Sequence, residues 1–156
     1  MGAGGMSFEQ RKRVSIGLEL AANPSILFLD EPTTGLDSLA AQSLVRNIRK
    51  IAASGRSVVC TIHQPSTVIF NSFDSLLLLK RGGQTVYFGN LGENSSKLIE
   101  FFENAPEVSP MPMNVNPATW MLDIIGAGTA AAAASAAGGS GGIDYAAHYA
   151  NSTLAK

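Results

Sequence analysis

The fold is decided by the stretch Ile26-Leu27-Phe28-Leu29-Asp30-Glu31-Pro32-Thr33-Thr34-Gly35-Leu36-Asp37. Its first four residues are large and apolar without polar alternation, which predicts a strand covered on both faces, as in a parallel sheet. Ligands of such sheets gather at the carboxyl ends of the strands, where Asp30 and Glu31 fall. Two adjacent carboxylates in this position suit metal-assisted nucleotide hydrolysis.

The next segments extend this strand into a repeating unit. Residues 38–53 place apolar side chains at helical spacing, with Asp37 or Ser38 available as the cap, and Ser57 to Ile62 is a second apolar strand. Strand, helix and strand predict a right-handed crossover with two parallel strands. His63 then falls at the sheet edge that holds the two carboxylates. This convergence is the main argument for a site.

The flanking sequence predicts further elements of an α/β protein. Expected are a helix over residues 7–22, a hairpin of strands 76–79 and 85–88, and short helices over 98–103 and 118–125. Residues 127–142 are almost wholly Ala, Gly and Ser, which predicts a flexible linker. Residues 143–156 are expected to form a tail helix that packs elsewhere in a longer protein.

Composition excludes several classes of protein. The 156 residues, 46% hydrophobic and 15% charged, suit a globular protein with a core. A net charge of −1 gives no indication of the excess positive charge that nucleic-acid binders carry. The single Cys60 excludes an internal disulfide, and its apolar neighbours favour a buried core residue. The sequence shows no signal peptide and no apolar run of membrane-spanning length, so membrane association is expected only through other regions.

Several motifs, taken together, resemble ATP-binding cassette (ABC) transporters of the G subfamily. The match begins at Gly5-Met6-Ser7-Phe8-Glu9-Gln10-Arg11-Lys12-Arg13, which resembles the signature loop, and continues through Asp30-Glu31-Pro32 (Walker B), Gly35-Leu36-Asp37 (D-loop) and Thr61-Ile62-His63-Gln64-Pro65 (switch histidine). Residues 82–89 and 116–123 resemble the pleiotropic-drug-resistance group. The sequences of residues 59–65 and 80–84 are more similar to the second nucleotide-binding domain of full-length transporters than to the first.

The resemblance covers roughly residues 5–126 and, more faintly, 144–156. It implies a partial P-loop NTPase-type parallel sheet with flanking helices, followed by a β-hairpin and an irregular helical tail. Residues 1–105 would be the carboxyl-terminal part of a nucleotide-binding domain, 106–126 a G-subfamily extension, 127–142 the linker and 143–156 a tail helix leading toward the membrane domain. The parent would act at the cytoplasmic face of a membrane, exporting lipids or xenobiotics with a second nucleotide-binding domain and transmembrane domains as partners.

The resemblance also assigns roles to single residues. Asp30 would hold Mg²⁺, and Glu31 would polarise the water that attacks the terminal phosphate of ATP. His63 would donate to that phosphate and sense its presence. Asp37 would communicate between two facing domains, although it is also suited to be simply a helix cap.

The signature loop departs from the general pattern Leu-Ser-Gly-Gly-Gln. Phe8 and Glu9 replace two glycines that normally let the backbone approach phosphate. A carboxylate near a phosphate is repelled by roughly 4 kcal/mol at contact distance in an effective dielectric near 20, unless it points away. Ser7 and Gln10 are therefore expected to close a degenerate site on ATP bound by the facing domain.

No Gly-x-x-x-x-Gly-Lys-Ser/Thr phosphate loop occurs among the 156 residues. The isolated chain is therefore expected neither to bind ATP tightly nor to hydrolyse it. Two alternatives stay open. A soluble ABC ATPase shares these motifs but is disfavoured by residues 82–84 and 116–123, whereas a non-catalytic interaction module from a truncated transporter is favoured by the missing loop.

Overall fold

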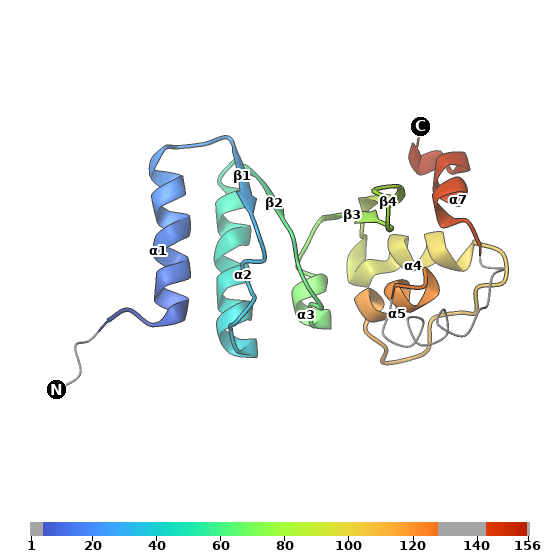
Figure 1. Ribbon diagram of the computed structural model, residues 1–156, viewed down its shortest axis with the longest axis horizontal. Coiled ribbons are helices and arrows are strands. Elements are labelled where there is room, and N and C mark those ends of the chain that lie inside the picture. Colours follow the sequence, from blue (N-terminus) through green and yellow to red (C-terminus); the bar gives the residue numbers. More distant parts are fainter. Residues whose placement is uncertain (1–4, 128–142, 156) are drawn as a thin grey trace. The chain divides into compact units, whose positions relative to one another are not determined.

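The computed structural model describes residues 5–127 and 143–155 and divides the chain into two compact units, Met1–Ser72 and Phe73–Lys156. Each unit has its own elements and is described separately. Figure 1 shows the course of the chain through them. Among the described residues, no helix combines the length and the apolar character needed to cross a membrane.

The first unit alternates helices and strands, as the sequence predicts. Its elements are α1 (Phe8–Ala21), β1 (Ile26–Leu29), α2 (Ser38–Ala53), β2 (Ser57–Cys60) and α3 (Thr67–Phe70). Asp37 caps α2, because its carboxylate accepts a 2.8 Å hydrogen bond from the backbone N–H of Ala40. The predicted cap is therefore confirmed.

β1 and β2 pair in parallel, with the register running from Ile26 opposite Ser57 to Leu29 opposite Cys60. Beyond the last pair, the N–H of Thr61 still donates to the carbonyl of Leu29 at 3.0 Å. The parallel strand, helix and strand unit is thus confirmed. The ladder also carries the backbone of both strands up to the edge where the polar residues begin.

The expectation that β1 is covered on both faces is wrong for the described structure. Leu27 is 4% exposed, but Ile26 is 54% and Phe28 74% exposed. The reason is that the sheet has two strands and is packed on one face, where α2 buries Ala41, Leu44, Val45 and Ile48. The helix α1 buries none of its residues, and Ile26 and Phe28 stay exposed on the other face of the sheet.

The second unit begins with the predicted hairpin. β3 (Ser75–Leu79) and β4 (Thr85–Asn90) are antiparallel, with an irregularity between Leu78 and Leu79. They are followed by η1 (Glu93–Ser95), α4 (Ser96–Glu103), α5 (Pro117–Ile124), α7 (Tyr145–Asn151) and η2 (Thr153–Ala155). The short helices predicted near residues 98–103 and 118–125 are therefore confirmed.

Aromatic rings form the core of the second unit. Tyr87 and Phe102 are fully buried, and Phe102 lies edge-on to Trp120 and Tyr145, with ring centroids 6.2 and 5.7 Å away. Tyr87 contacts Phe101 in the same edge-on manner at 5.1 Å. These offset geometries are the favoured ones for aromatic pairs.

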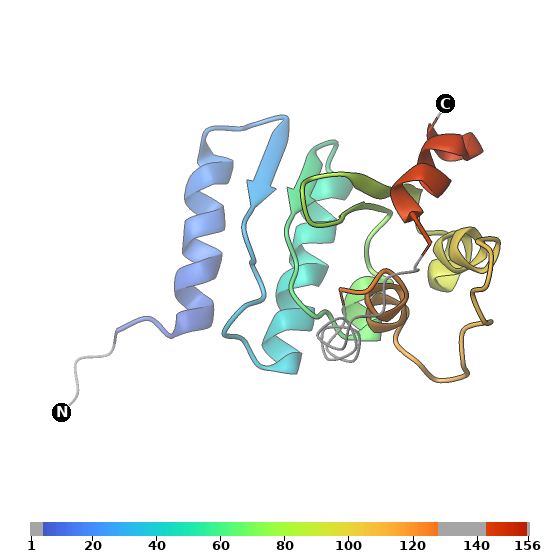
Figure 2. The same ribbon diagram turned by 45° about the vertical axis from the view of Figure 1, so that its right-hand side comes forward.

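The tail helix α7 packs within its own unit in the described structure, and its predicted packing in a longer protein stays a prediction. Tyr145 is buried, His148 lies 5.0 Å from the ring of Phe101, and Asp144 forms a 2.8 Å ion pair with Lys80. Figure 2 shows α7 next to the hairpin strands. The apolar side of α7 finds its partner in α4 and β4. The predicted linker lies outside the described residues except for Ala127.

Candidate functional site

The candidate site lies where β1 and β2 end. Because Leu29 and Cys60 are paired, the next residues, Asp30 and Thr61, leave the sheet side by side. The hydroxyl of Thr61 donates to Asp30 Oδ1 at 2.6 Å and accepts from the N–H of Glu31 at 2.8 Å. A single side chain, that of the residue after β2, thus contacts both Asp30 and the backbone of Glu31.

Glu31 is held in an unusual backbone conformation. Its φ of +42° lies in the left-handed region, which costs a non-glycine residue on the order of 1–3 kcal/mol. Lys12 of α1 donates to its carbonyl oxygen at 3.0 Å, and the hydroxyl of Thr34 donates to its carboxylate at 2.9 Å. The surrounding contacts therefore fix both the peptide and the side chain of Glu31.

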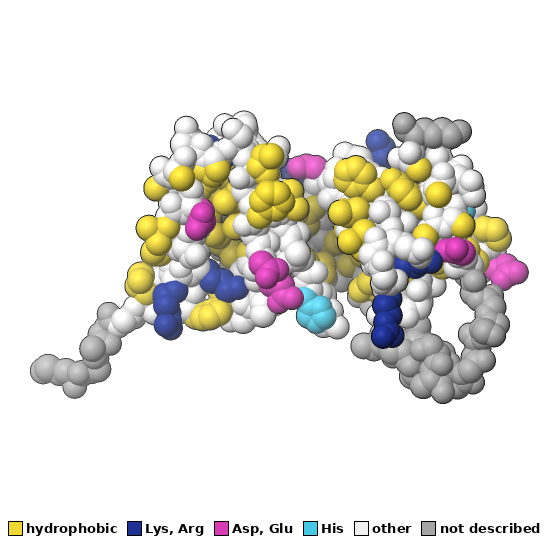
Figure 3. Space-filling view, turned by 45° about the horizontal axis from the view of Figure 1, so that its top comes forward, with side chains coloured by type: hydrophobic (Ala, Val, Ile, Leu, Met, Phe, Trp, Pro, Cys, Tyr) yellow, Lys and Arg dark blue, Asp and Glu magenta, His cyan; other side chains and the backbone are white. Residues whose placement is uncertain are grey.

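His63 follows β2 at the same edge, as predicted from the strand register. Its side chain is exposed, and the following residue, Gln64, has a left-handed φ of +45°. In the described part of the chain, no hydrogen bond or ion pair joins His63 to Asp30 or Glu31. Figure 3 shows acidic side chains and a histidine exposed on the same face. His63 is thus free to meet a ligand from solvent.

The residues of the signature-like loop are engaged with one another at the start of α1. Ser7 and Gln10 form a reciprocal capping box, with bonds of 3.2 and 2.8 Å between side chain and backbone. Glu9 forms an ion pair with Arg13 one turn later. This pairing offsets the negative charge that the sequence places in the loop. Ser7 and Gln10 are not brought together with Asp30, and their predicted contact with ATP stays a prediction.

The donor set at this edge offers Mg²⁺ a single carboxylate ligand, Asp30. The described residues contain no group of three or more His, Cys, Asp or Glu side chains that would form a protein cage for a metal. Asp30 uses Oδ1 to accept from Thr61, and its second oxygen makes no described hydrogen bond. One hard carboxylate ligand fits Mg²⁺, which keeps several waters and also binds phosphate oxygens.

Three contacts around Glu31 were missed by sequence reasoning. Thr61, Lys12 and Thr34 all bond to it, although only its neighbours Asp30 and His63 were expected beside it. The strand register was the available signal for Thr61, because the residue after Cys60 must lie opposite Asp30. Cys60 is only half-buried and does not belong to the buried core, so the expectation of a buried core residue is wrong, although its partial burial raises the pKa of its thiol.

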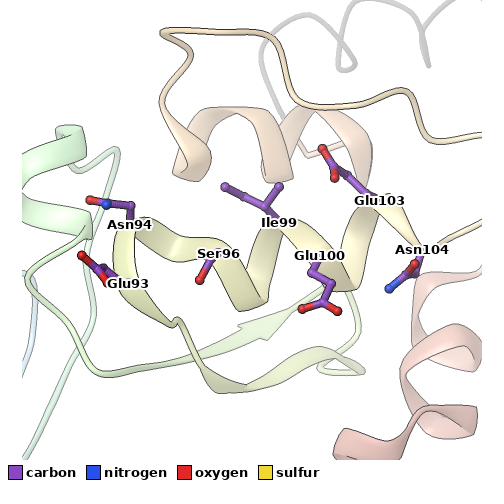
Figure 4. A pocket seen from close by; sticks show the side chains of 7 residues that line it. All are labelled: Glu93, Asn94, Ser96, Ile99, Glu100, Glu103 and Asn104. Atoms are coloured by element: carbon purple, nitrogen blue, oxygen red, sulfur yellow. The ribbon is translucent and has the colours of Figure 1, made fainter.

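A separate hollow lies in the second unit along α4. It has a volume of about 480 Å³, and it is lined by Glu93, Asn94, Ser96, Ile99, Glu100, Glu103 and Asn104 (Figure 4). One of its acids, Glu103, already accepts a 2.8 Å bond from the N–H of Met111. None of the predicted site residues lines this hollow.

Comparison with known proteins agrees with the motifs at the strand ends. Residues 63–138 match the family described as ABC-2 type transporter. ABC transporter G family member 41 of Arabidopsis thaliana is 53% identical over 155 residues, covering 99% of this chain and 10% of the relative. Member 38 of Oryza sativa subsp. japonica is 52% identical over 153 residues, covering 98% and 10%. The chain is a homologue of ABC transporter G family proteins.

This G family homologue spans about a tenth of the length of the curated relatives it matches. Member 36 of Arabidopsis thaliana is 58% identical over a shorter range of 122 residues, which is 78% of the G family homologue and 8% of the relative. The structure also resembles an ATP-binding cassette of an ABC transporter, solved in its ADP conformation. The TM-score is 0.55 at 29% identity, covering 62% of this chain and 37% of that one.

Proposed function

We propose that the chain is the carboxyl-terminal part of a nucleotide-binding domain in a G-subfamily ABC transporter of the pleiotropic-drug-resistance type. The observation that carries the proposal is the Asp30–Glu31 pair at the end of β1, held by Thr61 beside the segment that bears His63. In the parent, this domain hydrolyses ATP at the cytoplasmic face of a membrane and drives export of lipids or xenobiotics. We propose for this chain the layout expected from its sequence, with residues 1–105 in the nucleotide-binding domain, 106–126 as a G-subfamily extension, 127–142 as a linker and 143–156 as the tail.

The proposed roles follow the chemistry of phosphoryl transfer, which depends on positioning and on neutralising charge. Asp30 would hold Mg²⁺ through its water shell, and the bound ion would neutralise phosphate charge. Glu31 accepts a proton from the attacking water, and Thr34 orients the Glu31 carboxylate through its 2.9 Å hydrogen bond. His63, exposed at the same edge, donates to the terminal phosphate. The residues of this chain thus bind Mg²⁺ and the terminal phosphate, orient the base, and accept one proton from water.

The remaining site residues serve the facing domain. Ser7 and Gln10 approach nucleotide bound by the second nucleotide-binding domain, and Asp37, at the start of α2, transmits contact between the two. The capping box would have to open partly to free the Ser7 hydroxyl. Because this box must open first, Ser7 and Gln10 are expected to close poorly over the ATP of the facing domain. The replacement of two glycines by Phe8 and Glu9 acts in the same direction.

The decisive experiment is Glu31→Gln in the full-length transporter that contains this segment. ATP turnover at this site is expected to fall by at least 100-fold, because the amide cannot accept the proton of water, a step worth about 10²–10⁴ in rate. Binding of ATP should stay within about threefold, because Gln keeps the shape of Glu. Unchanged turnover would refute the role of Glu31 as the base.

For the 156-residue chain itself, we predict neither tight ATP binding nor hydrolysis. The sequence contains no phosphate loop, and backbone N–H groups that wrap the phosphates supply much of the affinity in such sites. Titration of the purified chain with labelled ATP and Mg²⁺ checks this. A micromolar dissociation constant would contradict the prediction.

The missing phosphate loop also supports a second candidate, a non-catalytic module that docks onto a transporter or regulator. An ATPase assay of the chain mixed with an intact partner domain separates the two. Stimulated hydrolysis that depends on Glu31 supports the catalytic proposal, whereas binding to the partner without any hydrolysis supports the module.

A further inference from the structure

We propose that Thr61 and Lys12 are positioning residues. They hold the backbone of Glu31 at its N–H and at its carbonyl oxygen, an arrangement called here the clamp, and thereby orient its carboxylate. The inference rests on the proposed function of Glu31 as the base. It adds two residues from different elements, one next to β2 and one in α1, to the working parts of that reaction. Neither of them would touch ATP or the attacking water.

The clamp consists of two hydrogen bonds to one residue. The N–H of Glu31 donates to Thr61 Oγ1 at 2.8 Å, and its carbonyl oxygen accepts from Lys12 Nζ at 3.0 Å. Thr61 is itself fixed, because its hydroxyl proton goes to Asp30 Oδ1 at 2.6 Å. Lys12 is steadied by the ring of Phe8, whose centroid lies 5.3 Å from its ammonium group. Both anchors therefore have a defined geometry.

The backbone of Glu31 needs such anchors. Its φ of +42° is a conformation that glutamate adopts rarely, so the peptide would rotate toward negative φ if it were released. That rotation would swing the carboxylate, which is attached to the same Cα, away from its place beside Thr34. A base must stand within about 2.6–3.2 Å of the proton it accepts, and a shift of about 1 Å can reduce a rate by about 100-fold.

The first test measures the clamp without catalysis, in the complete 156-residue chain. Hydrogen exchange of the Glu31 amide is followed in the wild type, Thr61→Val and Thr61→Ser. We expect Thr61→Val to exchange roughly tenfold faster, because the acceptor is lost, and Thr61→Ser to stay within about twofold. Thr119→Val, an exposed threonine of α5, is the matched control. Equal exchange in all variants would overturn the clamp.

The second test uses ATP turnover in the full-length transporter. Lys12→Met is expected to reduce kcat by roughly tenfold or more with KM for ATP within about twofold, since Lys12 contacts the backbone of Glu31 and not Asp30. Thr61→Val should reduce kcat by at least as much, because it also removes the hydrogen bond to Asp30. Thr61→Ser and Lys12→Arg should recover most of the rate. Lys97→Met, on the exposed side of α4, is the control for loss of a lysine.

Glu31→Gln separates this proposal from the proposed function. If Glu31→Gln keeps full turnover, the proposed function fails, and the exchange test still decides the clamp. If Glu31→Gln is inactive while Thr61→Val and Lys12→Met turn over like the wild type, the positioning role is overturned. Should Thr61→Val fail to fold, Lys12→Met decides the question alone, because it removes one partially exposed side chain.

Discussion

At the scale of single residues, Gly35 offers a sharp test of the loop after the carboxylates. Its φ is +80°, and an added Cβ would lie 2.8 Å from Cε1 of Phe8. Gly35→Ala should therefore lower the free energy of unfolding by about 1–2 kcal/mol, because alanine pays for a left-handed backbone. Urea unfolding of the first unit, followed by circular dichroism, measures the loss.

Gly17→Ala provides the matched control. Gly17 lies within α1, and a Cβ there meets nothing within 4 Å. Alanine is favoured over glycine in a helix by about 1 kcal/mol, so this variant should be neutral or more stable. A Gly35→Ala protein as stable as Gly17→Ala would show that the loop can change its backbone without cost.

The residues of the candidate site divide into those that a pattern can predict and those that it cannot. The placement of Asp30, Glu31 and His63 at one edge follows from strand pairing, which the apolar runs predict. The Lys12 bond to Glu31 joins α1 to a loop 19 positions away, and its donor sits on a helix with no buried residue to fix its direction. No periodicity in the sequence carries that information.

At the scale of elements, we predict that the attachment of α7 weakens in acid. The hydrogen bond from Lys80, followed by backbone bonds, lowers the pKa of Asp144 below its usual value of 3.8. A lowered folded pKa means that the stabilisation is present above the unfolded pKa and is lost as pH falls through the folded pKa. We expect the amide signals of Ala146 and Ala147 to shift as α7 loosens below about pH 4.

Asp144→Asn tests this assignment, because asparagine can still cap α7 but cannot pair with Lys80 by charge. Its Ala146 and Ala147 signals should lack the acid transition. If the transition persists in Asp144→Asn, another carboxyl group controls the attachment of α7.

Element boundaries were predicted well, and burial was not. The hairpin and the short helices follow from turn residues and apolar spacing close in sequence. The open face of β1 could not be predicted, because a run of four apolar residues is compatible with a strand covered on one face as well as with a strand covered on both. The docking of α7 depends on Phe101, more than 40 positions earlier, and such distant contacts leave no local pattern.

At the scale of the whole molecule, the aromatic core dominates the stability of the second unit. Phe102 is fully buried among Tyr87, Trp120 and Tyr145. Phe102→Ala should cost about 3–5 kcal/mol through lost contacts and a cavity. Since Trp120 is the single tryptophan of the chain, its fluorescence during urea unfolding reports on this unit.

Phe88→Ala is the control for this measurement, because Phe88 is 55% exposed and its loss should cost roughly 1 kcal/mol or less. Equal losses for the two variants would mean that the ring cluster does not hold the unit together. The homology to G family proteins could be predicted from motifs, whereas the division into two units could not, because contacts between residues distant in sequence leave no local pattern.

The open face of the small sheet has a consequence for handling the chain at the bench. Ile26, Phe28 and Val59 project from strands that each keep an unpaired edge, because the sheet has two strands. Apolar side chains beside unpaired strand edges invite addition of a strand from another molecule. Preparations of the isolated chain should therefore become turbid with rising concentration, and a charged substitution at Phe28 should delay that turbidity.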